Sequence, residues 1–179
     1  MDYAIIINTD CFDGRGGLSI KIDVRFPTAL QIMLSLALAE QQSVSHLSST
    51  QLAENLGANP SFVRKLLVPL VQNKLLSSQM GKAGGVRLAR PAAEITLRDI
   101  YRAVVADTKI WAPRTGVPNR CLVSSNVQGY FEELIDDAQE AILSMLGQRT
   151  LLHGLTELER RESAKRPTSK VRLAIQNKR

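Results

Sequence analysis

The fold is decided by residues 49–90, which read STQLAENLGANPSFVRKLLVPLVQNKLLSSQMGKAGGVRLAR. The first part, STQLAENL, has the apolar spacing of a short amphipathic helix, with Ser49 or Thr50 as its N-cap. The turn GAN follows, in which Gly57 can take a left-handed conformation. PSFVRKLLVPLVQNKLL then predicts a second helix, with Pro60 near its start, where a missing N–H costs nothing. Helix, glycine-containing turn and helix is the helix-turn-helix arrangement that binds DNA.

Directly behind these helices the sequence predicts a β-hairpin, in which the strand-like runs LLSSQ and VRLAR flank the glycine-rich turn MGKAGG. A hairpin attached to a helix-turn-helix makes a winged helix. Residues 49–91 hold six basic residues against one acidic residue, a net charge of +5, which is typical of a phosphate-binding surface. Lys82 at the hairpin tip and Arg87 on the return strand suit phosphates or a minor groove. From charge alone, the alternative is a solvated pair of basic helices in another fold.

Further candidates for DNA contact lie on the outward face of the second helix. If the N-terminus of this helix enters the major groove, Arg64 suits bidentate contact with a guanine, and Asn59 and Ser61 suit a phosphate or an adenine. Lys65 suits a phosphate. Pro69 should bend or end the helix, because it removes a hydrogen bond to the Lys65 carbonyl.

This stretch and the residues around it resemble the Rrf-type winged-helix regulators of bacteria. That is the family of the iron–sulfur regulator IscR, the nitric-oxide sensor NsrR and the cysteine-metabolism repressor CymR. The strings GGVRLARP and EITLRDIYRAV are the most specific part of a similarity that spans residues 22–158. The resemblance implies a homodimeric transcription factor, usually a repressor, that senses a redox or metabolic signal. It also implies DNA reading at positions matching Asn59, Ser61 and Arg64. The iron–sulfur regulator has an acid where this chain has Arg64, so we expect a different sequence preference.

The chain divides into five expected segments, and the fold class is mainly α with a small β-hairpin: a winged helix-turn-helix domain plus a long C-terminal dimerisation helix. The segments are an N-terminal extension (1–21), the winged-helix DNA-binding domain (22–105), a sensor loop (106–124), dimerisation helices (125–159) and a basic disordered tail (160–179). The tail holds eight basic residues against one acid, so the remainder of the chain sums to −1. The net charge of +6 therefore says little about DNA binding.

A long acidic helix is predicted for SNVQGYFEELIDDAQEAILSMLG, residues 125–147. Apolar residues recur in it at spacings of three and four: Val127, Phe131, Leu134, Ala138, Ala141 or Ile142, and Met145. This narrow seam suits a second helix. Because the segment has five acids and no base, it should pair two subunits rather than bind DNA. The alternative is a core helix of a monomer.

The loop before this helix holds Cys121. In the cluster-binding members, three cysteines in this loop ligate an iron–sulfur centre, which needs several thiolates. Because Cys11 and His153 are distant in sequence, we expect no cofactor and no metal site, and the resemblance is to the cluster-free branch with a single loop cysteine. Cys121 is then a small buried hydrophobic residue, a redox-sensing thiol beside Arg120 and a helix N-terminus, or, least favoured, a metal ligand.

We expect a cytoplasmic protein that is not an enzyme. No apolar run is long enough to span a membrane, and the start MDYAIIINTD has an acid where a secretory signal has bases. Two histidines offer little for acid–base catalysis, so no catalytic residue is expected. The expected partners are a double-stranded DNA operator and a second copy of the chain, and no membrane. A winged-helix module for protein contact and a repressor with a small-molecule effector remain alternatives. The operator sequence and the role of Cys11 stay open.

Overall fold

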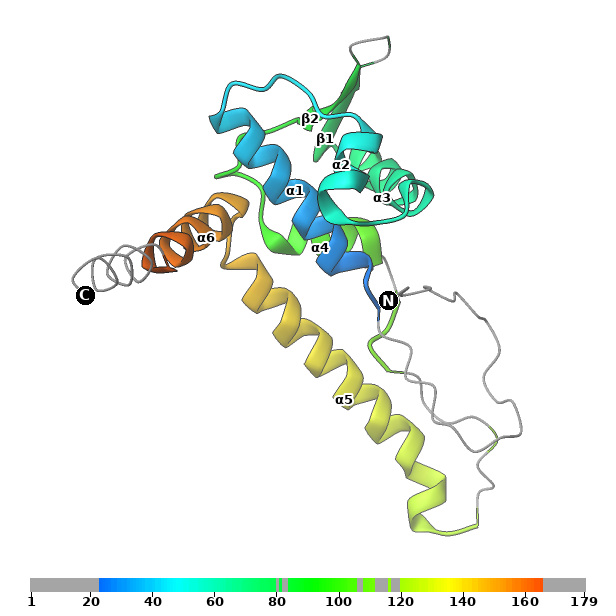
Figure 1. Ribbon diagram of the computed structural model, residues 1–179. Helices are drawn as coiled ribbons and strands as arrows, with labels where there is room; N and C mark the ends of the chain where they lie inside the picture. The colour runs from blue at the N-terminus through cyan, green and yellow to red at the C-terminus, as the bar shows by residue number, and fades with distance from the viewer. Residues whose placement is uncertain are drawn as a thin grey trace, which may run out of the picture.

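The computed structural model describes residues 23–79, 81, 84–105, 108–111, 116 and 120–165. In order, they form α1 (Arg25–Gln41), α2 (Ser49–Leu56), α3 (Pro60–Gln72), β1 (Leu76–Gln79), β2 (Gly85–Leu88), α4 (Leu97–Val105), α5 (Leu122–Gly147) and α6 (Leu151–Lys165). A mainly helical chain with one small hairpin confirms the expected fold class (Figure 1). The predictions on Cys11, Lys82 and the tail beyond residue 165 lie outside the described residues. The first part of the expected disordered tail, residues 160–165, instead continues α6, so the prediction of disorder there is wrong. None of the described helices has the length and apolar content needed to cross a membrane.

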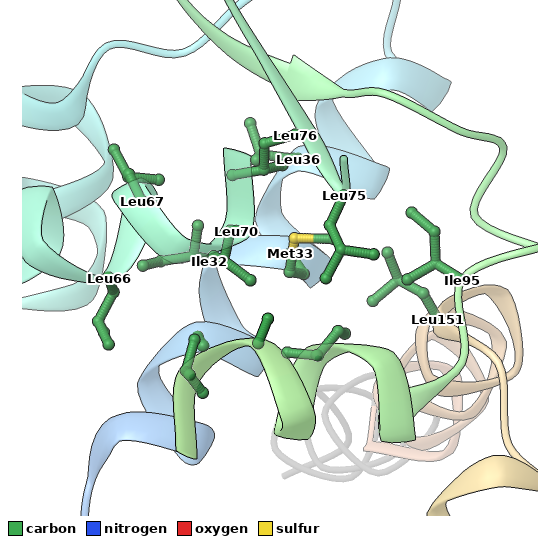
Figure 2. Close-up of a cluster of buried hydrophobic side chains, with 14 of the residues drawn as sticks. Ile32, Met33, Leu36, Leu66, Leu67, Leu70, Leu75, Leu76, Ile95 and Leu151 are labelled. Atoms are coloured by element: carbon green, nitrogen blue, oxygen red, sulfur yellow. The ribbon is translucent and has the colours of Figure 1, made fainter. Parts of the chain in front are cut away.

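α1 is the central helix of the winged-helix half. Apolar residues cover most of its circumference, as in a helix buried on most sides, and α2, α3, α4, α6 and β2 all pack against it. Figure 2 shows Ile32 and Met33 of α1 among Leu66 and Leu70 of α3 and Leu75. Burying a side chain of this size contributes about 1.5–3 kcal/mol, so this contact holds α3 in place.

The caps of α2 are made by residues on either side of the helix. Ser48, rather than the expected Ser49 or Thr50, is the N-cap: its Oγ accepts the Gln51 N–H at 3.2 Å, and Gln51 Oε1 accepts the Ser48 N–H at 2.8 Å. Gly57 ends α2 with φ 59° and ψ 31°, in the left-handed region predicted for this turn. Glycine tolerates that region because it has no Cβ.

α3 continues unbroken through Pro69, so the prediction that it could end there is wrong. The helix instead stops at residue 72, four residues before the predicted end, because Lys74 adopts φ 56°. The Leu75 N–H then donates to the Leu70 carbonyl at 3.0 Å. Asn73 also closes this end, since both its N–H and its Nδ2 donate to the Pro69 carbonyl, at 3.0 and 2.8 Å.

The predicted hairpin is confirmed, with β1 and β2 antiparallel and Ser77 opposite Arg87. Leu47, just before α2, adds a bridge to Val86 of β2, with hydrogen bonds in both directions at 3.1 and 2.9 Å. Gly85 permits this approach, since a Cβ there would lie 2.6 Å from the Leu47 carbonyl oxygen. The wing is therefore tied to the helix-turn-helix through backbone atoms.

The later helices start as follows. Thr96 and Asp99 make a reciprocal cap at the start of α4: the Thr96 N–H donates to Asp99 Oδ2 at 2.9 Å, and the Asp99 N–H donates to Thr96 Oγ1 at 3.1 Å. α5 begins three residues earlier than predicted, with Cys121 as its N-cap in place of Ser125 or Asn126. The expected sensor cysteine is therefore the residue directly before the first residue of α5.

The base of α5 is joined to the winged-helix half by main-chain hydrogen bonds. The Leu97 N–H donates to the Arg149 carbonyl at 2.9 Å, and the Leu151 N–H donates to the Ile95 carbonyl at 2.8 Å. α6 then returns to pack on α1. Away from this junction, α5 extends out from the rest of the molecule (Figure 1).

The left-handed turn at Gly57 leads to a stability prediction. We expect Gly57→Ala to lower the free energy of unfolding by about 1–2 kcal/mol, the cost of a left-handed conformation for an L-residue, because no atom lies within 4 Å of the added Cβ. Gly129→Ala, in the exposed interior of α5, is the matched control and should raise that free energy by about 0.5–1 kcal/mol. Urea unfolding at one fixed protein concentration measures the free energy of unfolding of both variants. Equal effects of the two substitutions would contradict the left-handed conformation of Gly57.

Candidate nucleic-acid interface

α3 separates an apolar face from a polar one. Its buried residues are Val63, Leu66, Leu67 and Leu70. With 3.6 residues per turn, Ser61, Arg64 and Lys65 fall on the opposite side, and all three are exposed. Among the described residues, neither Arg64 nor Lys65 has a hydrogen-bond or ion-pair partner, and α3 contains no acid. Both cations are therefore free to contact an external anion.

Asn59 is less available than the sequence suggested. Its Oδ1 accepts the Ser61 N–H at 2.8 Å and caps α3. Bidentate recognition of adenine needs an acceptor and a donor from the same amide, so that contact would require the cap to break. The remaining Nδ2 donor fits a phosphate oxygen, and the exposed Ser61 hydroxyl lies beside it.

Arg87 extends the basic surface onto the wing. It is exposed on β2, and its Nε donates to Ser77 Oγ at 3.3 Å across the hairpin, which leaves its terminal nitrogens for an outside group. A small open cavity of about 200 Å³ separates this strand from the end of α1, with His46 and Arg87 on its wall. The predicted tip contact, Lys82, lies outside the described residues.

Arg90 counts toward the basic charge of the sequence but points elsewhere. Its guanidinium lies 3.8 Å from the Asp99 carboxylate at the start of α4, and its Nε is buried without a hydrogen-bond partner. Part of the +5 charge therefore belongs to the contact between the wing and α4 rather than to the DNA-facing surface.

Cys121 is exposed, so the interpretation of it as a small buried residue is wrong. The Ser124 hydroxyl lies 3.5 Å from Sγ and donates to it. This hydrogen bond, followed by the backbone N–H groups of Ser124 and Val123, holds the pKa of the Cys121 thiol below its usual value. Arg120, expected to act in this way, is not among the causes. A lowered pKa increases the fraction of the reactive thiolate at neutral pH.

The predicted seam of α5 is largely uncovered. Within the helix, only Ile135 and Leu146 are buried, whereas Leu134 is 42% exposed and Tyr130 is 62% exposed. Trp111 of the preceding loop packs against Phe131 with ring centroids 6.5 Å apart. The sequence analysis missed Tyr130, although its spacing from Val127 and Leu134 places it on the same stripe.

The chain is similar to known transcriptional regulators. The family model Rrf2, described as an iron-dependent transcriptional regulator, matches residues 22–157. YwnA of Bacillus subtilis, named as a helix-turn-helix transcriptional regulator, is 26% identical over 130 residues, which cover 73% of this chain and 93% of YwnA. The regulator NsrR of Oceanobacillus iheyensis is 24% identical over 123 residues, covering 69% of this chain and 81% of NsrR. These relatives are named as regulators rather than enzymes.

Solved structures support the fold. IscR from T. potens superposes with a TM-score of 0.58 at 21% identity, covering 78% of this chain and 89% of IscR. CymR, the global cysteine regulator of B. subtilis, gives a TM-score of 0.54 at 21% identity, covering 77% of this chain and 98% of CymR. Both comparisons show the winged-helix fold.

The iron named in the family description raises the question of a cluster. Within the described parts of the chain, no group of three or more His, Cys, Asp or Glu side chains could hold a metal ion. Cys121 brings one exposed thiol, and iron–sulfur clusters need several. The described donor set does not fit such a cluster.

The free cations on α3 lead to a binding prediction. We expect Arg64→Ala to weaken binding to a selected DNA site by about 1–3 kcal/mol and to relax the preference at one base pair, as for loss of a bidentate guanine contact. Lys65→Ala should weaken binding to selected and random DNA alike and reduce the salt slope by about one. Fluorescence-anisotropy titrations at two salt concentrations measure both effects.

Arg161→Ala is the control for these titrations, because this exposed arginine of α6 bonds to Glu157 rather than facing the interface. Unchanged affinity for both α3 variants, with Arg161→Ala also unchanged, would remove α3 from the interface.

Proposed function

We propose, from the premise that the chain belongs to the Rrf2 family of transcriptional regulators, that it is a homodimeric repressor whose DNA binding responds to oxidation of Cys121. The observation that carries the proposal is the outward face of α3, where Arg64 and Lys65 are exposed and unpaired. In this proposal α3 reads the major groove and the wing contacts the flanking backbone. A protein held on promoter DNA in this way blocks transcription by occupying the site.

Dimerisation is proposed from the exposed seam of α5. Val127, Tyr130 and Leu134 recur at the spacing of three and four that suits helix pairing, and all three are exposed. The five acids of this helix make it unsuited to DNA. Two copies joined along α5 would present two reading helices to half-sites about one helical turn apart.

The proposed signal is a hydroperoxide that oxidises Cys121, the N-cap residue of α5. The Cys121 thiolate attacks one oxygen of a hydroperoxide, the O–O bond breaks, the sulfur is oxidised by two electrons to a sulfenic acid, and the second oxygen leaves as hydroxide or alkoxide. The new S–O bond uses one sulfur lone pair and removes the negative charge from the sulfur, so the hydrogen bond from Ser124 weakens, and the added hydroxyl enlarges the helix cap. A change at this end of the paired α5 helices would alter the distance between the winged-helix halves (the heads) of the two subunits.

The redox step leads to a prediction on DNA binding. In a Cys11→Ser background, peroxide should weaken operator binding, and Cys121→Ser should abolish that response while leaving reduced binding intact. Ser124→Ala should raise the pKa of Cys121, because its hydroxyl is the main cause of the lowered value. The thiolate fraction at neutral pH then falls, and oxidation should be slower. Anisotropy against time after peroxide addition measures the rates.

Ser125→Ala is the matched control, since Ser125 is exposed in the same turn and its side chain makes no described contact with the thiol. If the Cys121→Ser variant still responds to peroxide, Cys121 is not the residue that senses the oxidant. The proposal that the chain is a repressor is not affected by this result.

The seam leads to a prediction on assembly. Leu134→Asp places a charge within the apolar stripe of α5, and burying an unpaired carboxylate is costly, so we expect a monomer at concentrations where the wild-type chain is a dimer. Sedimentation equilibrium gives the masses. Glu133→Gln, next to it on the exposed acidic side, should leave the dimer intact. A dimeric Leu134→Asp would place the subunit contact elsewhere.

A small-molecule effector is the second candidate for the signal, and one feature favours it. A cleft of about 440 Å³ between α4 and α5 is lined by Arg98 and Arg102 on one side and Asp136 and Glu140 on the other. Gln139, also in its wall, has a buried Oε1 with no hydrogen-bond partner. An affinity for DNA that stays the same after peroxide treatment but changes when a charged metabolite is added would favour this candidate. A regulatory function that Arg64→Ala and Lys82→Ala both leave intact would favour a module for protein contact instead.

A further inference from the structure

Val68 is an apolar side chain on the DNA-facing side of α3. It is 55% exposed and lies four residues after Arg64 and seven after Ser61, which places all three on one stripe of the helix. The sequence analysis assigned it to neither face of the helix. The sequence feature that could have placed Val68 on this face is its spacing of seven residues from Ser61, a predicted DNA contact.

Val68 lies outside the core formed by the described residues and is not buried by any of them. α3 turns Leu66, Leu67 and Leu70 toward α1, as Figure 2 shows, and the stripe with Val68 faces the other way. Its neighbours one turn earlier are Arg64 and Lys65, both exposed. A lone valine amid cations is too small an apolar area to hold a protein partner, whereas it matches the mixed chemistry of a DNA groove.

The major groove offers one apolar group, the C5-methyl of thymine, which apolar side chains contact. Along the helix axis, Val68 lies about 6 Å beyond Arg64, from a rise of 1.5 Å per residue. For a helix lying along the major groove, which winds around the duplex, this distance spans about one to two base-pair steps. When Arg64 meets a guanine in this orientation, Val68 lies above a base one or two pairs away.

We propose that Val68 is a specificity-determining residue that contacts a thymine methyl one or two base pairs from the guanine read by Arg64. This inference rests on the proposed DNA-reading function of α3 and adds a second, apolar readout to it. It also explains why the exposed stripe holds a valine where a polar residue would be better solvated.

Replacing single thymines by deoxyuridine tests this contact, since the exchange removes only the methyl group. An operator is first selected from random DNA with the full chain, and each thymine is then exchanged in both half-sites. For the wild-type chain, we expect one exchange to raise Kd about threefold to fivefold per half-site, from the loss of one buried methyl contact. For Val68→Ala, the same exchange should have no effect.

Val68→Ala should fold normally, because alanine has a higher helix propensity than valine at an exposed position. Leu158→Ala is the control, since Leu158 is an exposed apolar residue on α6, and it should keep the full deoxyuridine effect. If every deoxyuridine effect persists in Val68→Ala, or none exists, the proposal is overturned while the DNA-reading function stands. If random DNA yields no selected site, the proposed function fails, and this inference fails with it.

Discussion

The packing of α3 against α1 is the contact on which the rest of the structure depends. Leu66 and Leu70 lie among Ile32 and Met33 in the core, and this burial sets the rotation of α3 about its axis. A rotation by one residue, 100° for a helix of 3.6 residues per turn, would carry the cation of Arg64 toward the apolar interior, where an unpaired charge is very costly. The same apolar contact therefore stabilises the fold and decides which side chains of α3 face outward.

A second constraint connects this head to α5. Main-chain hydrogen bonds join Leu97 to Arg149 and Leu151 to Ile95, and the Arg98 guanidinium lies over Gly147, 3.0 Å from where a Cβ would be. This close packing fixes the base of α5. With 26 residues, the helix is about 39 Å long, so Cys121 lies far from the head. Under the proposed function, a change at Cys121 reaches the head through the pairing of two long helices.

Much of the fold follows from local sequence signals, because they act over a few residues. The bounds predicted for the helix at 49–56 agree with those of α2, since its apolar period and the Gly57 turn are contained in the segment itself. The hairpin follows from glycines between two strand-like runs. The Thr96 cap with Asp99 needs side chains only three residues apart. The outward position of Arg64 follows from the helical period together with the apolar residues beside it.

The sequence by itself thus determined the elements, their order and the face of α3 that carries the cations. Only the tertiary structure decided how individual side chains are used. Arg90 turns to Asp99 instead of DNA because the wing packs against α4, and Asn59 commits its oxygen to the α3 cap. Cys121 is exposed because α5 starts outside the core, and Val68 is uncovered because none of the described helices and strands packs over it. Such outcomes depend on contacts between distant segments, which a local pattern of residues does not contain.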